Sequence, residues 1–275
     1  MAAWETQIFS IAFYCYFLAS CLYIGYLIWL QGSLGRMAHW LSLLGVVANG
    51  MAIALRTTRA GHIPFATMYE FGMVFVFGML LVYLYVEYRC QHYALGAFVL
   101  PVAFLLCGGF SLFYQEARPL MPALKSNWLL IHVVTAVIAY GALAVSFALA
   151  VMYLWKRRLE QNGEDGPIMY LLPSLNTLDD WVNRLITLAV PFLTLLIITG
   201  AVWAEYAWGS YWRWDPKETW SLITWLTYAI YLHGRATMGW RGARAMGWAV
   251  VGFMMVLFTF VGVNVLLPGL HSYAL

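Results

Sequence analysis

Long apolar runs separated by short polar segments follow one another along the whole chain. Each run is close to the roughly 20 residues that an α-helix needs to cross the hydrocarbon core of a bilayer. The runs occupy residues 8–30, 38–55, 68–87, 93–111, 128–155, 183–203, 219–234 and 245–267. The pattern predicts an all-α, polytopic integral membrane protein with about eight transmembrane helices. An even number of crossings places both termini on one side.

The composition leaves no room for a large water-facing domain. Of the 275 residues, 63% are hydrophobic and 10% are charged, whereas soluble domains are about half apolar and a quarter charged. Nucleic-acid-binding proteins and large soluble enzymes are therefore excluded as classes. We expect residues 1–275 to form a single membrane domain in contact with lipid.

The basic residues predict the orientation of this domain. Nine of the fifteen Lys and Arg residues fall on one side of the predicted helices, among them the cluster 156–158 and the trio Arg235, Arg241 and Arg244. Because short loops rich in Lys and Arg stay cytoplasmic, we expect this side to face the cytoplasm and both termini to lie outside. The longest loop, residues 156–182, is then cytoplasmic, and its Gly and Pro residues predict a linker with a short interfacial helix.

A tryptophan-rich segment, residues 203–225, is the most informative part of the sequence. It reads WAEYAWGSYWRWDPKETWSLITW and holds six of the fourteen tryptophans. An aromatic belt at the membrane interface is the ordinary explanation of such residues, but it does not account for this density or for the polar residues among the rings. A surface of indoles suits a flat, apolar ligand such as a porphyrin or a quinone. The candidate ligand-binding residues here are Trp208, Trp212, Trp214, Asp215 and Trp220.

Asp215 and Glu218 also admit a purely structural interpretation. With Asp at the N-cap, Pro216 at the first helical position and Glu at the third, they predict a capping box that begins the seventh span. Capping and ligand placement are compatible.

Three of the six histidines are candidates for binding a metal-containing ligand. His132 lies five residues into the fifth span, about 7 Å deep at 1.5 Å per residue, and His271 lies in the outer C-terminal tail. Both flank the tryptophan-rich segment on its own side, so two neutral imidazoles there could form a bis-His axial site for haem iron. His233 lies roughly 22 Å further down the seventh span, near the cytoplasmic end. It can equally be a helix-end residue.

The outer loop RTTRAGHIPFATMYE adds three further candidates, Arg56, Arg59 and His62. The two guanidinium groups could pair with carboxylates of an amphipathic ligand, of which the propionates of haem are one example. A solvated loop without a ligand is the alternative.

Four stretches of the sequence resemble a known family. The stretches WGSYWRWDPKETW, ITWLTYAIYLHGR, GVNVLLPGLHSYAL and GHIPFATMYE are similar to those of the CcsA family, the integral-membrane component of system II cytochrome c maturation. The resemblance implies that His132 and His271 bind haem b at the outer face, over the segment named WWD after its tryptophans and aspartate. It also implies that His233 takes part in haem entry from the cytoplasm.

The resemblance further implies partners and a location. Family members work with a second membrane protein, CcsB (called ResB in some bacteria), and deliver haem to apocytochrome c for thioether attachment at a C-x-x-C-H motif. We therefore expect the haem-handling subunit of a holocytochrome c synthase, assisted by a thiol reductant protein, in the bacterial cytoplasmic membrane or the thylakoid membrane. No residue identifies a general acid or base. Two alternatives stay open: haem delivery to a haem chaperone, as by the related CcmC, and a haem b or quinone electron-transfer subunit.

Overall fold

The computed structural model describes residues 2–164 and 166–267. Within these residues the chain is a bundle of long antiparallel helices without strands. The helices that cross the bundle are α1 (Ala2–Trp29), α2 (Gly32–Ala60), α3 (Met68–Cys90), α4 (Gly96–Ser111), α5 (Asn127–Gln161), α7 (Leu175–Trp208), α8 (Pro216–Thr237) and α9 (Ala243–Leu257). Short elements join or extend them: η1 (Tyr93–Leu95), η2 (Pro122–Leu124), α6 (Ile168–Leu171), η3 (Phe258–Gly262) and α10 (Val263–Leu266). The all-α fold is as predicted.

Seven helical segments within the described ranges are long and apolar enough to cross a membrane. The eighth crossing helix, α8, is of similar length but is less apolar because threonines and tyrosines occur along it. Thr224 and Thr227 each donate a hydrogen bond to the backbone carbonyl four residues earlier, and the hydroxyls of Thr224 and Thr259 are 2.8 Å apart. These threonine hydroxyls are satisfied inside the protein, which lowers the cost of placing them within the bundle.

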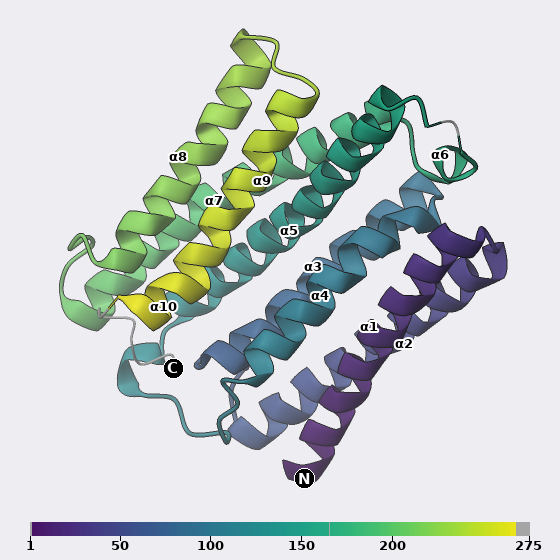
Figure 1. The fold of residues 1–275 in the computed structure, drawn as a ribbon. Helices are drawn as coiled ribbons and strands as arrows, with labels where there is room; N and C mark the ends of the chain where they lie inside the picture. Colours follow the sequence, from purple (N-terminus) through teal and green to yellow (C-terminus); the bar gives the residue numbers. More distant parts are fainter. Residues whose placement is uncertain (1, 165, 268–275) are drawn as a thin grey trace.

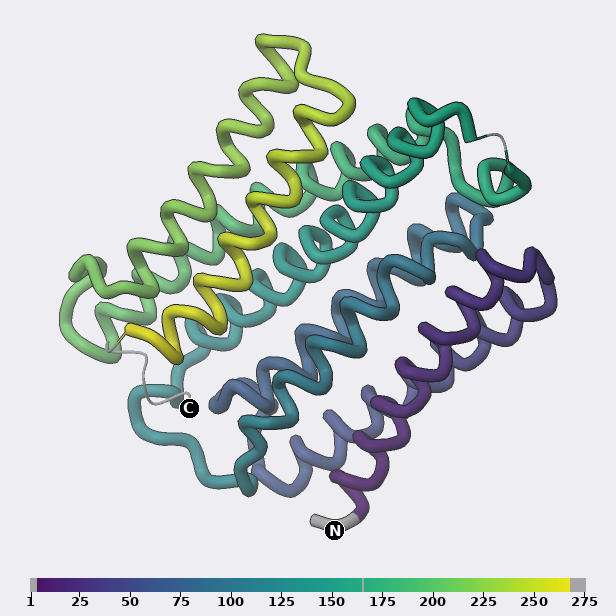
Figure 2. Tube along the Cα trace, viewed as in Figure 1, coloured from purple at the N-terminus to yellow at the C-terminus, as the bar shows by residue number. Residues whose placement is uncertain are grey.

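The helices form two groups that pack side by side (Figure 1). In one group α1 packs on α2 and α4, and α4 packs on α3; in the other α5 packs along α7 and against α9, which also contacts α8. The contacts of α3 and α4 with α5 join the two groups. Figure 2 shows that α1 begins at the same end of the bundle as α10 ends. We call this the outer end, after the orientation that the basic residues predict, and the opposite one the inner end.

The long connection between the fifth and sixth spans is shorter than expected. Residues 156–161 continue α5, and residues 175–182 are the first two turns of α7, which begins at the N-cap Ser174. The stretch LNTLDDW therefore belongs to a long helix, because its Leu178 and Val182, the residue directly after the stretch, continue the buried face of α7. The short helix in the connection is α6, and the buried ammonium group of Lys156 donates to the carbonyls of Leu172 and Pro173 beside it.

Candidate functional site

A cleft opens at the outer end of the bundle, where the two groups of helices meet. Its walls come from the start of α3 and the loop before it, from α5 and α7, from the α7–α8 loop and from η3 and α10. The space between these walls, together with the open solvent at the mouth, is about 1050 Å³. The side chains in its walls that bring chemistry include His132, Trp203, Trp208, Trp212, Lys217, Glu218 and Asn264.

His132 is held in this cleft by α7. Its Nδ1 lies 2.8 Å from the backbone carbonyl oxygen of Leu196, which can only accept, so Nδ1 is the donor. In the neutral ring the lone pair is then on Nε2. Metal-binding histidines are typically oriented in this way, through a hydrogen bond from the other ring nitrogen. The tautomer of His132 is therefore the one that can ligate iron through Nε2.

Two residues of α7 shape the surroundings of the imidazole. A Cβ atom at Gly200 would lie 2.8 Å from His132 Nδ1, so α7 can approach the ring this closely only where a side chain is absent. The indole of Trp203 stacks beside the imidazole at 6.3 Å between ring centroids, and its Nε1–H donates to the carbonyl of Ala123 at 2.9 Å. Trp208 meets Trp203 edge to face at 4.8 Å. The ring of His132 thus lies against a fixed aromatic wall.

The loop between α7 and α8 is ordered by a few polar contacts. Helix α7 ends at Gly209, whose φ of 71° is the left-handed conformation that glycine adopts without a Cβ penalty. The guanidinium group of Arg213 then donates to the carbonyl of Trp208. The carboxylate of Glu218 accepts from the backbone N–H groups of Arg213 at 2.8 Å and Asp215 at 3.1 Å. These contacts fix the loop that presents Trp212 to the cleft.

Asp215 caps α8, as predicted. Its carboxylate accepts from the backbone N–H of Lys217 at 3.0 Å, and the carboxylate of Glu218 accepts from the backbone N–H of Asp215 in return, which completes the capping box. Trp214 has a φ of 57° and is 67% exposed, and it meets Trp212 edge to face at 5.6 Å. Trp220 packs on Phe258 at 4.3 Å. Of the predicted segment residues, Trp208 and Trp212 line the cleft, whereas Asp215, Trp214 and Trp220 are placed around it.

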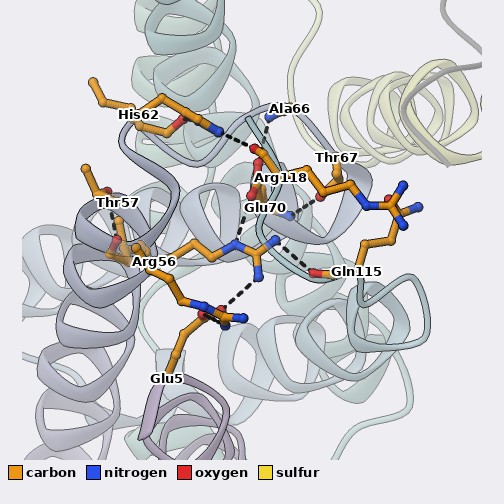
Figure 3. Close-up of polar contacts among 12 residues, drawn as sticks. Glu5, Arg56, Thr57, His62, Ala66, Thr67, Glu70, Gln115 and Arg118 are labelled. Carbon is orange, nitrogen blue, oxygen red and sulfur yellow. Dashed lines mark hydrogen bonds and ion pairs between the residues drawn. The ribbon is translucent and has the colours of Figure 1, made fainter. Parts of the chain in front are cut away.

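Arg56 and Arg59 lie in a buried ion-pair network at the outer end of α1, α2 and α3 (Figure 3). Arg56 is fully buried, and its Nε donates to Glu70 at 2.8 Å, its Nη1 to Glu5 at 3.1 Å and its Nη2 to the carbonyl of Gln115 at 2.8 Å. Arg59 donates to the second oxygen of Glu5 at 3.0 Å. Two guanidinium groups and two carboxylates therefore balance one another without a ligand.

This network is connected to the cleft through Glu70. Its second carboxylate oxygen accepts from the backbone N–H of Ala66 at 2.9 Å, while its own N–H donates to the hydroxyl of Thr67. Ala66 and Thr67 belong to the wall of the cleft. His62 lies in the same loop, and its ring nitrogens contact the carbonyl oxygens of Ile63 at 2.9 Å and Arg118 at 3.0 Å. Arg56, Arg59 and His62 surround the site without lining it.

The two other predicted histidines are not in the cleft. His271 lies outside the described residues. His233 is exposed on α8, near the inner end of the bundle, as its distance along the helix predicted. Leu226 and Ile230, which precede it by about two turns and one turn, are also exposed, so the three side chains form one stripe on the outward face of α8.

Sequence reasoning did not assign a role to Lys217 or Asn264, yet both line the cleft. Lys217 is part of the tryptophan-rich segment, where its position in the first helical turn suggested only the start of a span. Asn264 is the one amide side chain in the last apolar run of the sequence, and a polar side chain at membrane depth is itself a signal of function. The π-helix η3, which ends two residues before Asn264, is the other signal, because such segments occur at functional sites.

Comparisons with known proteins agree with this picture. The family model described as cytochrome C assembly protein matches residues 65–271. The cytochrome c biogenesis protein CcsA of Trieres chinensis is 36% identical over 284 residues, which cover 89% of this chain and 91% of that protein. CcsA of Guillardia theta is 38% identical over 251 residues, 84% and 83% of the two chains. CcsA of Chlamydomonas reinhardtii is 41% identical over 234 residues, 81% of this chain and 64% of that protein.

A solved structure shares the fold. The cytochrome c heme lyase CcmF superposes with a TM-score of 0.72 at 20% identity. The match covers 94% of this chain and 46% of CcmF, so this chain spans less than half the length of that protein. At this identity the likeness is one of helix arrangement.

Proposed function

Because this chain belongs to the cytochrome c assembly protein family, in which its relatives are CcsA proteins, it acts in cytochrome c biogenesis, and we propose that it carries haem b to the outer face of the membrane. Haem is the substrate in this proposal. It is held in the outer cleft between His132 and His271 and is presented to apocytochrome c. Each thiol of the C-x-x-C-H motif then adds its S–H bond across one vinyl group of the haem.

The hydrogen bond from His132 Nδ1 to Leu196 is the observation that carries this proposal. It gives the imidazole the tautomer and the fixed orientation of an axial ligand. The adjacent indoles of Trp203, Trp208 and Trp212 supply a flat apolar wall of the kind that a porphyrin face requires. Holding the haem fixed also supports attachment, because two thiols must meet two vinyl groups in one orientation.

An inner site with a partner completes the proposal. A haem bound through His233 alone would keep one axial position open, so we propose that a CcsB-type membrane protein contributes an opposing histidine. The exposed stripe of Leu226, Ile230 and His233 on α8 suits an interface within the membrane. The membrane itself would be the bacterial cytoplasmic membrane or the thylakoid membrane, with a thiol reductant protein keeping the apocytochrome cysteines reduced.

The proposal is tested by the absorption spectrum of the purified protein. We expect bands of bis-His haem b in the wild type, loss of haem from the outer site in His132→Gly, and recovery on addition of imidazole, which occupies the vacated axial position. His92→Gly, which alters a histidine at the inner end, is the matched control and retains the spectrum. A wild-type protein that takes up no haem, or a His132→Gly variant with the parental spectrum, would overturn the proposal. A bound quinone in a haem-free protein would support the electron-transfer alternative.

A further inference from the structure

Lys217 is a cation of the outer cleft that forms no ion pair with a carboxylate of the described residues. Lys217 lines the cleft from the first turn of α8, and its ammonium group donates to the side-chain oxygen of Asn264 at 3.2 Å. Across residues 2–164 and 166–267, no carboxylate oxygen lies within 4.0 Å of this nitrogen. The arginines nearby differ, since Arg56 and Arg59 are each paired with carboxylates of the chain.

The neighbours of Lys217 hold its ammonium group in place without neutralising it. Asn264 is buried, and its amide nitrogen donates to the carbonyl of Phe260 at 2.8 Å and contacts the sulfur of Met68 at 3.9 Å. Its oxygen is therefore directed to the lysine. The ring of Phe260 lies 5.9 Å from the ammonium nitrogen, in the range of a cation–π contact. Besides one hydrogen bond and one aromatic face, the ammonium group has only the longer-range attraction of Asp215, which lies beyond ion-pair distance.

The two carboxylates closest in sequence to Lys217 are used by the backbone. Asp215 accepts from the N–H of Lys217 as the N-cap of α8. Glu218 accepts from the backbone N–H groups of Arg213 and Asp215. Their roles in the capping box explain why neither turns toward the ammonium group. A cation kept in an apolar cleft without a counter-ion is stabilised when a ligand brings an anion.

We propose that Lys217 is the residue that recognises a carboxylate of the ligand in the outer cleft. This inference rests on the proposed function and deepens it: with haem as substrate, the group recognised is a propionate. Asn264 acts as a positioning residue, because it touches the lysine and orients its ammonium group toward the cleft. Lys217 would thereby select a porphyrin that carries free acid groups over one whose acids are masked.

The test compares two ligands on the same protein. Haem b carries two charged propionates, whereas in its dimethyl ester both are masked as neutral methyl esters. The purified wild-type chain is titrated with each ligand, and binding is followed by the absorption spectrum. We expect wild type to prefer haem b at least ~10-fold, the range of a hydrogen bond between charged groups. Lys217→Gln, which can still donate to Asn264, should reduce this preference to about 2-fold or less, and Lys217→Arg should preserve most of it.

Lys125→Gln is the matched control, because it removes a lysine from the outer loops without altering the cleft. It should keep the wild-type preference. A Lys217→Gln variant that melts as wild type and still prefers haem b as strongly would overturn the inference and leave the proposed function standing, as would a wild-type protein that binds both ligands equally well. If wild type binds neither porphyrin, both proposals fail.

If Lys217→Gln does not fold, Asn264→Asp supplies a second comparison. Its new carboxylate gives Lys217 a counter-ion and should lower the preference for haem b in the same way. An unchanged preference in Asn264→Asp would also overturn the inference.

Discussion

The imidazole of His132 and the carbonyl of Leu196 are joined by a hydrogen bond of 2.8 Å between α5 and α7. The bond forms four residues before Gly200, at the point where α7 has no side chain to keep the ring away. The orientation of the candidate iron ligand therefore depends on a backbone atom of the neighbouring helix and on a missing Cβ. Both are features of the helix pair α5–α7.

The first prediction follows from this contact. In Gly200→Ala the new Cβ would lie 2.8 Å from Nδ1 and 2.9 Å from Cε1 of His132, so the imidazole has to move and its bond to Leu196 is lost. We expect haem affinity to fall by about 10- to 100-fold, as for other lost contacts that orient a metal ligand. Gly247→Ala, at a position where a Cβ meets nothing within 4 Å, is the control. Equal haem titrations for both variants would show that the orientation of His132 is unimportant.

A second prediction separates two tryptophans that are two residues apart. Trp212 lines the cleft, whereas Trp214 is 67% exposed and has a positive φ. Trp212→Ala should therefore reduce haem retention, because an indole is removed from the wall. Trp214→Gly should retain haem and relieve about 1 kcal/mol of backbone strain. Haem content and thermal unfolding of the two purified variants check this, and full haem retention in Trp212→Ala would favour an interfacial belt over a ligand wall.

The third prediction concerns the buried network of Figure 3. Replacing Arg56 by Met leaves Glu5 and Glu70 without their shared buried partner, which should destabilise the fold by about 3–5 kcal/mol. Arg59→Met, at a side chain that is 21% exposed, should cost much less. Thermal unfolding in detergent measures both. If Arg56→Met instead kept its stability and lost only haem, Arg56 would be a propionate ligand as the sequence suggested.

The fourth prediction treats Asp215 as a helix cap. Asp215→Ala removes the acceptor for the N–H of Lys217 and should destabilise the protein by about 1 kcal/mol. Asp215→Ser, which retains a capping oxygen, should recover most of the loss. If the serine variant unfolds as wild type but fails to retain haem, the carboxylate itself has a role at the ligand, which the capping interpretation does not include.

The fold was predictable because membrane spans are encoded locally. Each run of about 20 apolar residues can satisfy its backbone groups only as a helix, and all eight expected runs coincide with helices. The capping box at Asp215 was equally local, since it depends on residues within four positions of one another. Helix ends were harder to predict from the local sequence. Helix α7 begins eight residues before its apolar run, because Leu178 and Val182 pack inward even though charged residues lie between them.

The site was predictable only in part because it is assembled from distant segments. The depth of His132 and the density of tryptophans could be read from spacing, but the partners of Arg56 come from α1, α3 and the loop before η2. Nothing in the local sequence shows that the carboxylates of Glu5 and Glu70 would neutralise the guanidinium group of Arg56. The same limit applied to Lys217, whose neighbours Phe260 and Asn264 are more than 40 residues away.

The last prediction concerns the inner end of α8. His233 is exposed there, fifteen residues beyond Glu218 and so roughly 22 Å from the outer cleft, and it cannot share a ligand with His132. Its side chain continues a stripe with Leu226 and Ile230 on a face that no helix of the described chain covers.

In a complex with a CcsB-type partner, His233→Ala should lower haem entry at the inner site without altering the spectrum of haem already bound outside, because the two sites use different ligands. Co-purified complexes of wild type, His233→Ala and Thr237→Ala are compared for haem content and cytochrome c yield, with Thr237 as the control because it lies one turn further along the same helix. Unchanged haem entry in His233→Ala, or cytochrome c maturation by this chain without a partner, would return His233 to the role of an ordinary helix-end residue.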